Sequence, residues 1–196
     1  MKILHIDSSV TGAQSVSRPL SKEAAAKLAT TPGSTVTYRD LVDDPLNHYT
    51  AVLRIHGATP ELHTPAQKAE LAMGETILAE FLASDTIVIG APMYNFSIPS
   101  QLKAWIDLIV VAGKTFSYGA GGAKGLCGDK KVIIISSRGG KYGEVSPMDF
   151  QEGYLKTILG FIGVTDITII RAEGIGYGPE VAKTAIESAK AQIAKL

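Results

Sequence analysis

Five short apolar runs, separated by segments with helical periodicity, constrain the fold of this chain more than any other feature. The runs are residues 3–6, 36–38, 86–90, 132–135 and 167–170. Strands that alternate with helices are typical of a parallel sheet wrapped by helices. The central runs are apolar almost continuously, as expected of strands that are buried on both faces. The sequence therefore predicts an α/β protein: a small doubly wound sheet of five parallel strands with helices on both faces.

The segments between the runs carry clear helix signals. Residues 17–29 place apolar side chains four apart, and a helix over 102–111 has a broad apolar surface. The sequence Thr64-Pro65-Ala66-Gln67 combines a capping residue, a proline at the first helical position and a glutamine three residues after the cap. Further helices are predicted from Ser146, ending at Gly163, and from Pro179 onward.

Two connections are longer than a minimal five-strand sheet requires. Residues 41–63 are expected to hold a short helix near 49–55, and residues 115–128 have the pattern of a small hairpin. Connections of this length in a compact domain are often lids or binding loops. No repeat, low-complexity tract or linker interrupts the sequence, so we expect a single domain over residues 1–196.

Composition excludes several classes of function. Nineteen acidic and nineteen basic residues give a formal net charge of zero, which argues against nucleic acid as a partner. No apolar run is long enough to span a membrane, and the N-terminal run breaks at Asp7, as in a first strand rather than a secretory signal. The one cysteine, Cys127, excludes an internal disulfide and a cysteine-cluster metal site. We expect a cytoplasmic protein.

Three loops that follow apolar runs carry side chains suited to binding. Residues 8–17 are rich in hydroxyls and lead into a helix N-terminus, which favours an anion, and Arg18 beside it opposes the helix dipole unless an anion is present. Residues 93–96 place two aromatic rings and an amide after the third run, and residues 136–143 are rich in glycine. Each loop alone also fits an ordinary capping or strand-to-helix turn.

The expected strand order, 2-1-3-4-5, brings these three loops together at the carboxyl edge of the sheet. A phosphate-sized nest, an aromatic pair and a glycine-rich amide edge then become neighbours, which describes a flavin mononucleotide (FMN) site. The P-loop pattern and the Rossmann glycine fingerprint are both missing after the first run. The glycines at 174–178 have the wrong spacing for that fingerprint and are interpreted as a loop.

The sequence closely resembles the FMN-dependent NADH azoreductases, also described as quinone reductases, of the flavodoxin-like superfamily. The resemblance covers nearly the whole chain through KILHIDSS, GAPMYNFSIPSQLKAWID, AGKTFSY, SSRGG and LKTILGFIGVTD, followed by AEGI and GPE. It implies a flavodoxin-like three-layer sandwich that binds one FMN tightly per subunit and takes electrons from NADH. No separate nucleotide motif is present, so the dinucleotide is expected to share the cavity that faces the flavin.

The resemblance also implies positions for the cofactor contacts. Phosphate contacts are implied at Ser9, Ser15, Val16 and Ser17, ring contacts at Met93, Tyr94, Asn95 and Phe96, and contacts along the other ring edge at Ser137, Arg138, Gly139 and Gly140. The family commonly has a polar residue where Val16 stands, a difference of little weight if this position contributes its backbone N–H. Tyr118 and Phe161 resemble aromatics that wall the substrate space, although core packing explains each equally well.

The activity implied by the resemblance is a ping-pong transfer of two electrons from NADH to quinones or azo compounds, with azo cleavage in two cycles. FMN would carry the chemistry, so no catalytic side chain is expected. The four histidines (His5, His48, His56 and His63) lack metal-ligand spacing, and we expect no metal. A homodimer is implied, with the 102–111 helix at its interface or else buried within one chain.

Two rival functions use the same type of sheet. A flavodoxin-type electron carrier would have a strongly charged docking face, which the balanced composition does not support. A phosphoacceptor signalling domain needs an aspartate at the end of the third strand, where this chain has Ala91 and Pro92.

Overall fold

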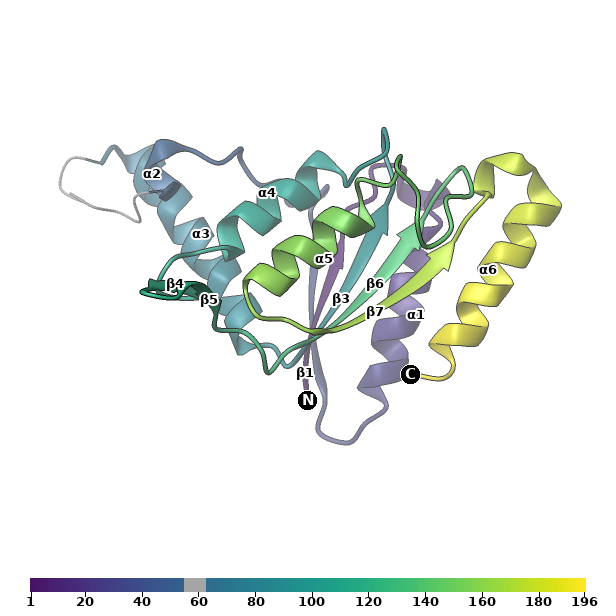
Figure 1. Ribbon diagram of the computed structural model, residues 1–196, viewed down its shortest axis with the longest axis horizontal. Coiled ribbons are helices and arrows are strands. Elements are labelled where there is room, and N and C mark those ends of the chain that lie inside the picture. The colour runs from purple at the N-terminus through teal and green to yellow at the C-terminus, as the bar shows by residue number, and fades with distance from the viewer. Residues whose placement is uncertain (55–62) are drawn as a thin grey trace.

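A five-stranded parallel sheet forms the centre of the computed structural model, which describes residues 1–54 and 63–196 (Figure 1). Its spatial order is β2-β1-β3-β6-β7, and every neighbouring pair is parallel. Each predicted apolar run forms one of these strands, so the predicted order is confirmed. The strands are β1 (Lys2–Asp7), β2 (Thr35–Asp40), β3 (Thr86–Pro92), β6 (Lys131–Ser137) and β7 (Asp166–Ala172).

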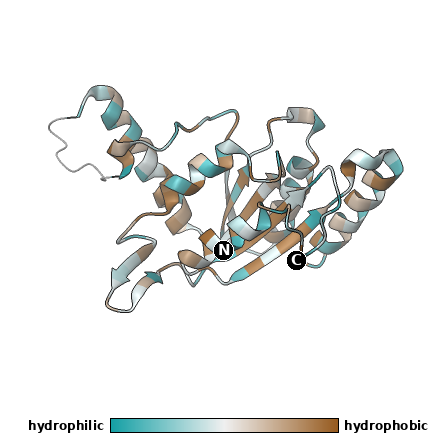
Figure 2. Ribbon diagram, turned by 45° about the horizontal axis from the view of Figure 1, so that its top comes forward, coloured by the Kyte–Doolittle hydropathy of each residue, from teal (hydrophilic) through white to brown (hydrophobic). Residues whose placement is uncertain are grey.

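Side chains that alternate along the strands enter two separate hydrophobic clusters. Leu4, Ile87 and Ile134 belong to one cluster, whereas their neighbours Ile3 and Val88 belong to the other. Because successive strand residues point to opposite faces, each cluster occupies one face of the sheet, and Figure 2 shows the apolar colour of the central strands. The first cluster includes residues of α3 (Pro65–Ala83), α4 (Ser100–Ile109) and α5 (Glu152–Phe161), and the second includes residues of α1 (Ser17–Ala29) and α6 (Pro179–Ile193).

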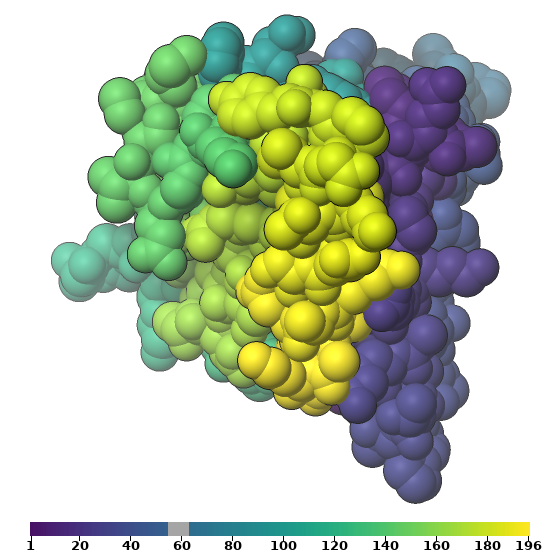
Figure 3. Space-filling model, turned by 90° about the vertical axis from the view of Figure 1, so that its right-hand side faces the viewer, coloured from purple at the N-terminus to yellow at the C-terminus, as the bar shows by residue number. Residues whose placement is uncertain are grey.

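The two helices of the second cluster lie against each other, and Figure 3 shows α6 (yellow) beside α1 (purple). In the first cluster, α4 is buried within the chain itself. Trp105 of this helix has no exposed surface, and its ring meets the Phe81 ring edge-on with centroids 6.0 Å apart. Its indole N–H has no hydrogen-bond partner among the described residues.

Helix ends follow the predicted capping residues, with one correction. At the start of α3, Thr64 accepts the Gln67 N–H and the Gln67 side chain accepts the Thr64 N–H, as predicted. The helix predicted from Ser146 instead begins at Glu152. In the turn before the helix, Asp149 Oδ1 accepts the N–H groups of Gln151 at 2.9 Å and Glu152 at 3.0 Å, which satisfies two of the donors that a helix start leaves free. The helix ends before Gly163, whose φ of 98° suits glycine.

The remaining elements are short. The predicted hairpin forms from β4 (Phe116–Gly119) and β5 (Gly122–Gly125). The helix predicted near 49–55 appears as α2 (Ala51–Arg54), whereas position 55 and His56 lie outside the described residues. Two 3₁₀ turns, η1 (Gly12–Gln14) and η3 (Ile175–Tyr177), follow β1 and β7. Among the described residues, no helix is long and apolar enough to cross a membrane.

Lys130 closes the C-terminal end of α3 and provides a test of this packing. It is 5% exposed, and its Nζ donates to the carbonyls of Leu82 (2.9 Å) and Ser84 (2.7 Å). We expect Lys130→Met to lower the free energy of unfolding in urea by about 1.5–3 kcal/mol, because hydrogen bonds from a charged donor are lost inside the protein. Its neighbour Lys131 is partly exposed, and Lys131→Met should change stability by less than about 0.5 kcal/mol. Equal losses in the two variants would contradict this account.

Candidate functional site

Loops that follow four of the five strands meet at the carboxyl edge of the sheet and enclose a pocket of about 270 Å³. This edge is where open α/β sheets bind ligands. No residue that the structure places in the lining carries a carboxylate, so the pocket suits an anionic group. The lining consists of Ser9, Thr11, Gln14, Val16, Pro92, Met93, Tyr94, Ser137, Arg138, Gly139, Ile175 and Gly176.

A second pocket of about 710 Å³ shares Met93 and Tyr94 with the first and also includes Asn95. Tyr94 therefore borders both spaces. Its hydroxyl accepts the Val10 N–H at 3.1 Å and lies 3.2 Å from Ser9 Oγ. These contacts tie the aromatic loop after β3 to the serine turn after β1.

The aromatic loop turns through two residues with left-handed backbone angles. Tyr94 and Ser97 exchange both backbone hydrogen bonds, at 2.9 and 3.0 Å, and the residues between them are Asn95 (φ 48°) and Phe96 (φ 69°). Such a turn normally uses glycine, and a bulky side chain there costs about 1–3 kcal/mol. Retained strain of this kind is a feature of binding sites, where a side chain is needed in a fixed place.

The N-terminus of α1 borders the same pocket. Its first flanking residue, Val16, offers no capping side chain, while Ser15 Oγ accepts the Arg18 N–H at 3.1 Å. Ser15 and Ser17 are buried, and their hydroxyl oxygens lie 3.3 Å apart. A helix N-terminus without a carboxylate cap attracts an anion through its free N–H groups and its dipole.

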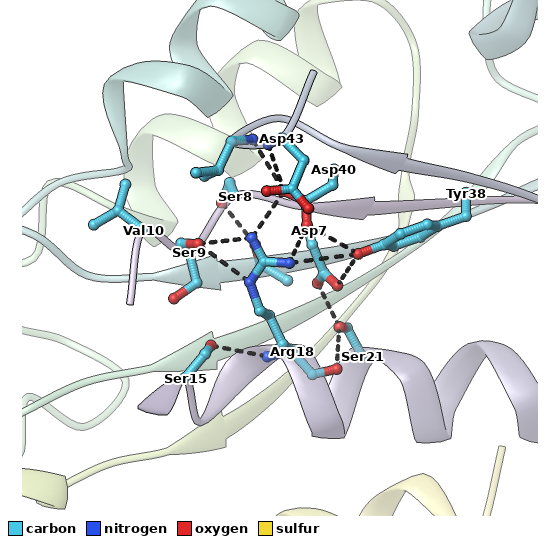
Figure 4. Close-up of polar contacts among 12 residues, drawn as sticks. Asp7, Ser8, Ser9, Val10, Ser15, Arg18, Ser21, Tyr38, Asp40 and Asp43 are labelled. Carbon is cyan, nitrogen blue, oxygen red and sulfur yellow. Dashed lines mark hydrogen bonds and ion pairs between the residues drawn. The ribbon is translucent and has the colours of Figure 1, made fainter. Parts of the chain in front are cut away.

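The anion beside Arg18 is a carboxylate of the protein itself. This finding corrects the prediction that a bound anion accounts for a cation at the start of α1. The guanidinium pairs with Asp40 at the end of β2, with Nη2 2.8 Å from Oδ1 (Figure 4). Hydrogen bonding from Arg18 lowers the pKa of Asp40 to about 2, so the pair is ionised at neutral pH. The two residues are far apart in sequence and become neighbours only through the pairing of β1 with β2.

Arg138 is part of the pocket lining, yet its side chain, including the guanidinium, is completely buried. It pairs with Asp149 at 2.8 Å, Glu173 at 3.2 Å and Glu152. Glu152 in turn holds Arg171 through two hydrogen bonds of 2.8 Å. The Arg138 side chain therefore fixes the loops around the pocket and leaves its backbone to face the ligand space.

The two glycines after Arg138 have different surroundings. A Cβ atom on Gly139 would meet no other atom within 4 Å, whereas one on Gly140 would lie 3.2 Å from the Tyr142 ring. The Gly139 carbonyl accepts the Gly176 N–H at 2.9 Å, which joins the loops after β6 and β7. Gly139 thus presents bare backbone to the pocket.

The structure divides the predicted cofactor residues into those that face the pockets and those behind them. Ser9, Val16, Met93, Tyr94, Ser137, Arg138 and Gly139 line the first pocket, and Asn95 lines the second. Ser15, Ser17, Phe96 and Gly140 lie outside both linings.

Five lining residues are not among the predicted cofactor contacts, although the first two lie within the predicted anion-binding loop 8–17: Thr11, Gln14, Pro92, Ile175 and Gly176. Ile175 and Gly176 belong to the glycine segment that the sequence indicates only as a loop. The expected strand order places the end of β7 beside the end of β6. This neighbourhood was the signal that could have identified Ile175 and Gly176 as lining residues.

The two predicted substrate residues lie elsewhere in the chain. Tyr118 and Phe161 flank Phe116 of the hairpin, with ring centroids 5.3 and 4.7 Å from it. Figure 1 shows the hairpin on the opposite side of the molecule from α6. Tyr118 is 75% exposed. Their substrate role stays a prediction.

Comparison with known proteins identifies the family to which this chain belongs. Residues 1–196 match the family described as flavodoxin-like fold. FMN-dependent NADH:quinone oxidoreductase 2 of Pseudomonas aeruginosa is 54% identical over 196 residues, which cover 99% of this chain and 97% of that protein. The chain belongs to this flavodoxin-like oxidoreductase family. A second family member, FMN-dependent NADH:quinone oxidoreductase 1 of Pseudomonas putida, is 50% identical with the same coverage.

Solved structures of azoreductases share the fold of the present chain. Azoreductase AzrA superposes with a TM-score of 0.89 at 29% identity, covering 100% of this chain and 98% of that one. An FMN-dependent NADH-azoreductase from Bacillus anthracis, solved in complex with FMN, has a TM-score of 0.86 at 26% identity and covers 99% and 98%. The family resemblance drawn from the sequence motifs is confirmed.

Proposed function

We propose that this chain is an FMN-dependent oxidoreductase that passes two electrons from NADH to a quinone or an azo compound. The observation that carries the proposal is the pocket at the sheet edge, where a serine turn, the Tyr94 loop and the bare backbone of Gly139 converge. Relatives about half identical over nearly their whole length are FMN-dependent NADH:quinone oxidoreductases, which supports the same activity here.

The residues proposed to hold FMN form three groups, of which Ser15, Ser17, Phe96 and Gly140 lie outside the pocket linings. Ser9, Ser15, Val16 and Ser17 would hold the phosphate through hydroxyl and backbone N–H groups at the α1 N-terminus. Residues 93–96 would flank the ring system, and residues 137–140 would follow its other edge. When bound, FMN supplies the acceptance and return of a hydride, which no side chain can perform.

The protein's own share in the reaction is binding, orientation and exclusion of water. The backbone N–H groups of Gly139 and Gly140 would stabilise negative charge that develops at the ring edge. Met93 and Ile175 contribute apolar side chains to the pocket lining, which would help to exclude water during the transfer. We propose a ping-pong order in which NADH leaves before the acceptor enters, and two such rounds for complete azo cleavage.

We further propose that the enzyme is a single cytoplasmic domain that works as a homodimer. Because α4 is buried within its own chain, the interface is assigned to exposed apolar side chains outside this helix. Tyr118, Val145 and Phe150 are more than half exposed. A second subunit would bring Tyr118 and Phe161 over the pocket of its partner, and sedimentation equilibrium at twice the chain mass is the expected result.

The purified protein is expected to show flavin absorbance in the visible range and to oxidise NADH continuously when a quinone is present. Apoprotein should regain both properties with added FMN. An electron carrier of flavodoxin type would bind FMN but would not turn over with NADH and quinone. Failure of the apoprotein to bind FMN would remove the basis of the proposal.

A further inference from the structure

We propose that Arg18 and Asp40 are positioning residues that hold the serine turn of the phosphate site from behind, so that the affinity for FMN depends on a pair that does not face it. The inference rests on the function proposed above. Arg18 lines a separate pocket of about 440 Å³ together with His5, Lys22 and Tyr38, and its guanidinium contacts the serine turn through the backbone carbonyl of Ser9.

The guanidinium of Arg18 binds one carbonyl group of the serine turn through two hydrogen bonds. Arg18 Nε and Nη2 both donate to the Ser9 carbonyl oxygen, at 3.2 and 2.9 Å (Figure 4). On the pocket side, Ser9 Oγ lies 3.0 Å from Thr11 Oγ1 and 3.2 Å from the Tyr94 hydroxyl. Ser9 therefore transmits the position of the Arg18 guanidinium to two side chains that line the pocket.

Asp40 fixes the guanidinium. Its two oxygens pair with Arg18 Nη1 and Nη2, and a planar guanidinium held at two points has a defined orientation. The carboxylate is itself fixed, because Oδ1 accepts the Val42 N–H at 3.0 Å and Oδ2 lies 3.2 Å from the Tyr38 hydroxyl.

The same network continues into the core of the sheet. The Tyr38 hydroxyl lies 3.1 Å from Asp7 Oδ2, and Ser21 Oγ donates to Asp7 Oδ1 at 2.6 Å. Gly90 on the adjacent strand leaves room for this carboxylate, since a Cβ there would lie 2.5 Å from Asp7 Oδ1. Buried groups thus anchor the pair, as a precise binding site requires.

Removal of the Asp40 charge distinguishes a positioning role of this residue from a purely electrostatic one, because the two roles change the affinity for FMN in opposite directions. A nearby negative charge opposes an anionic phosphate, so its loss through charge alone would make FMN bind more tightly. If Asp40 instead acts by holding Arg18 and the Ser9 carbonyl in place, its loss makes FMN bind more weakly. We expect Asp40→Asn to raise the Kd for FMN about tenfold, the effect of losing one charge-assisted hydrogen bond.

The experiment is a fluorescence titration of apoprotein with FMN at neutral pH. The matched control is Asp44→Asn, which removes the same charge from an exposed residue that pairs with Arg39. Its Kd should stay within about twofold of wild type, because exposed ion pairs contribute little. Tyr38→Phe is the milder companion variant, since it removes only the hydroxyl beside Asp7 and Asp40, and it should raise the Kd about two- to threefold.

The outcomes are distinguishable. A Kd for Asp40→Asn that equals or falls below that of Asp44→Asn overturns the inference, as does a lower melting temperature in Asp40→Asn and Tyr38→Phe without any change in FMN affinity. If Asp40→Asn does not fold, Tyr38→Phe alone decides the question. Failure of the wild-type protein to bind FMN would instead overturn the proposed function.

Discussion

Replacing Arg138 with methionine is expected to lower the free energy of unfolding by about 3–5 kcal/mol. The guanidinium has no solvent exposure and pairs with three carboxylates, Asp149, Glu152 and Glu173. Methionine preserves much of the length and burial of the side chain, but it leaves those charges inside the protein without the guanidinium, and Arg171 still pairs with Glu152. Urea unfolding at neutral pH, followed by circular dichroism, measures the loss.

Arg171→Met is the control for that variant. The Arg171 side chain is 23% exposed and contacts Glu152, which would keep Arg138 as a partner. A partly exposed ion pair contributes about 1 kcal/mol or less, so this variant should lose far less stability. If both variants lose a similar amount of unfolding free energy, the complete burial of Arg138 does not determine the size of that loss.

Gly139→Val is expected to weaken FMN binding by about 10- to 100-fold, the effect of 1–3 kcal/mol of overpacking. A Cβ at this position meets no protein atom within 4 Å, and its backbone is not left-handed. The new side chain would therefore leave the folded protein intact and occupy the space assigned to the ring edge. Titration of apoprotein with FMN gives the Kd, and thermal unfolding without FMN gives the stability.

Gly160→Val provides the matched substitution away from the pocket. Gly160 lies near the end of α5, and a Cβ there also meets nothing within 4 Å. Its FMN affinity should equal that of wild type. If Gly139→Val binds FMN as tightly as Gly160→Val does, the backbone of Gly139 does not face the cofactor.

Features set by local chemistry were predictable from the sequence. The apolar runs identified all five strands of the central sheet, and Thr64 with Gln67 identified the start of α3, because capping joins residues only three positions apart. The start of α5 was predicted too early because Ser146 and Asp149 are both suitable caps, and only the folded chain shows that Asp149 Oδ1 reaches the N–H of Glu152.

Contacts between distant segments were not predictable in the same way. Arg18 meets Asp40 because β1 pairs with β2 in a register that places Asp7 beside Asp40. The carboxylates around Arg138 likewise come from two segments that follow it, the start of α5 and the end of β7. No spacing rule within one element connects such residues, so the loops of the site were predictable whereas the ion pairs that support them were not.

The burial of Trp105 gives this protein a built-in reporter for only one side of its sheet. It is the one tryptophan of the chain, and its indole is fully enclosed in the cluster formed with α3 and α5. Its emission will therefore follow the opening of that layer, whereas backbone probes follow the whole chain. Whether the two signals change together during unfolding will reveal if the α1–α6 side, which carries the serine turn, separates from the rest as an independent unit.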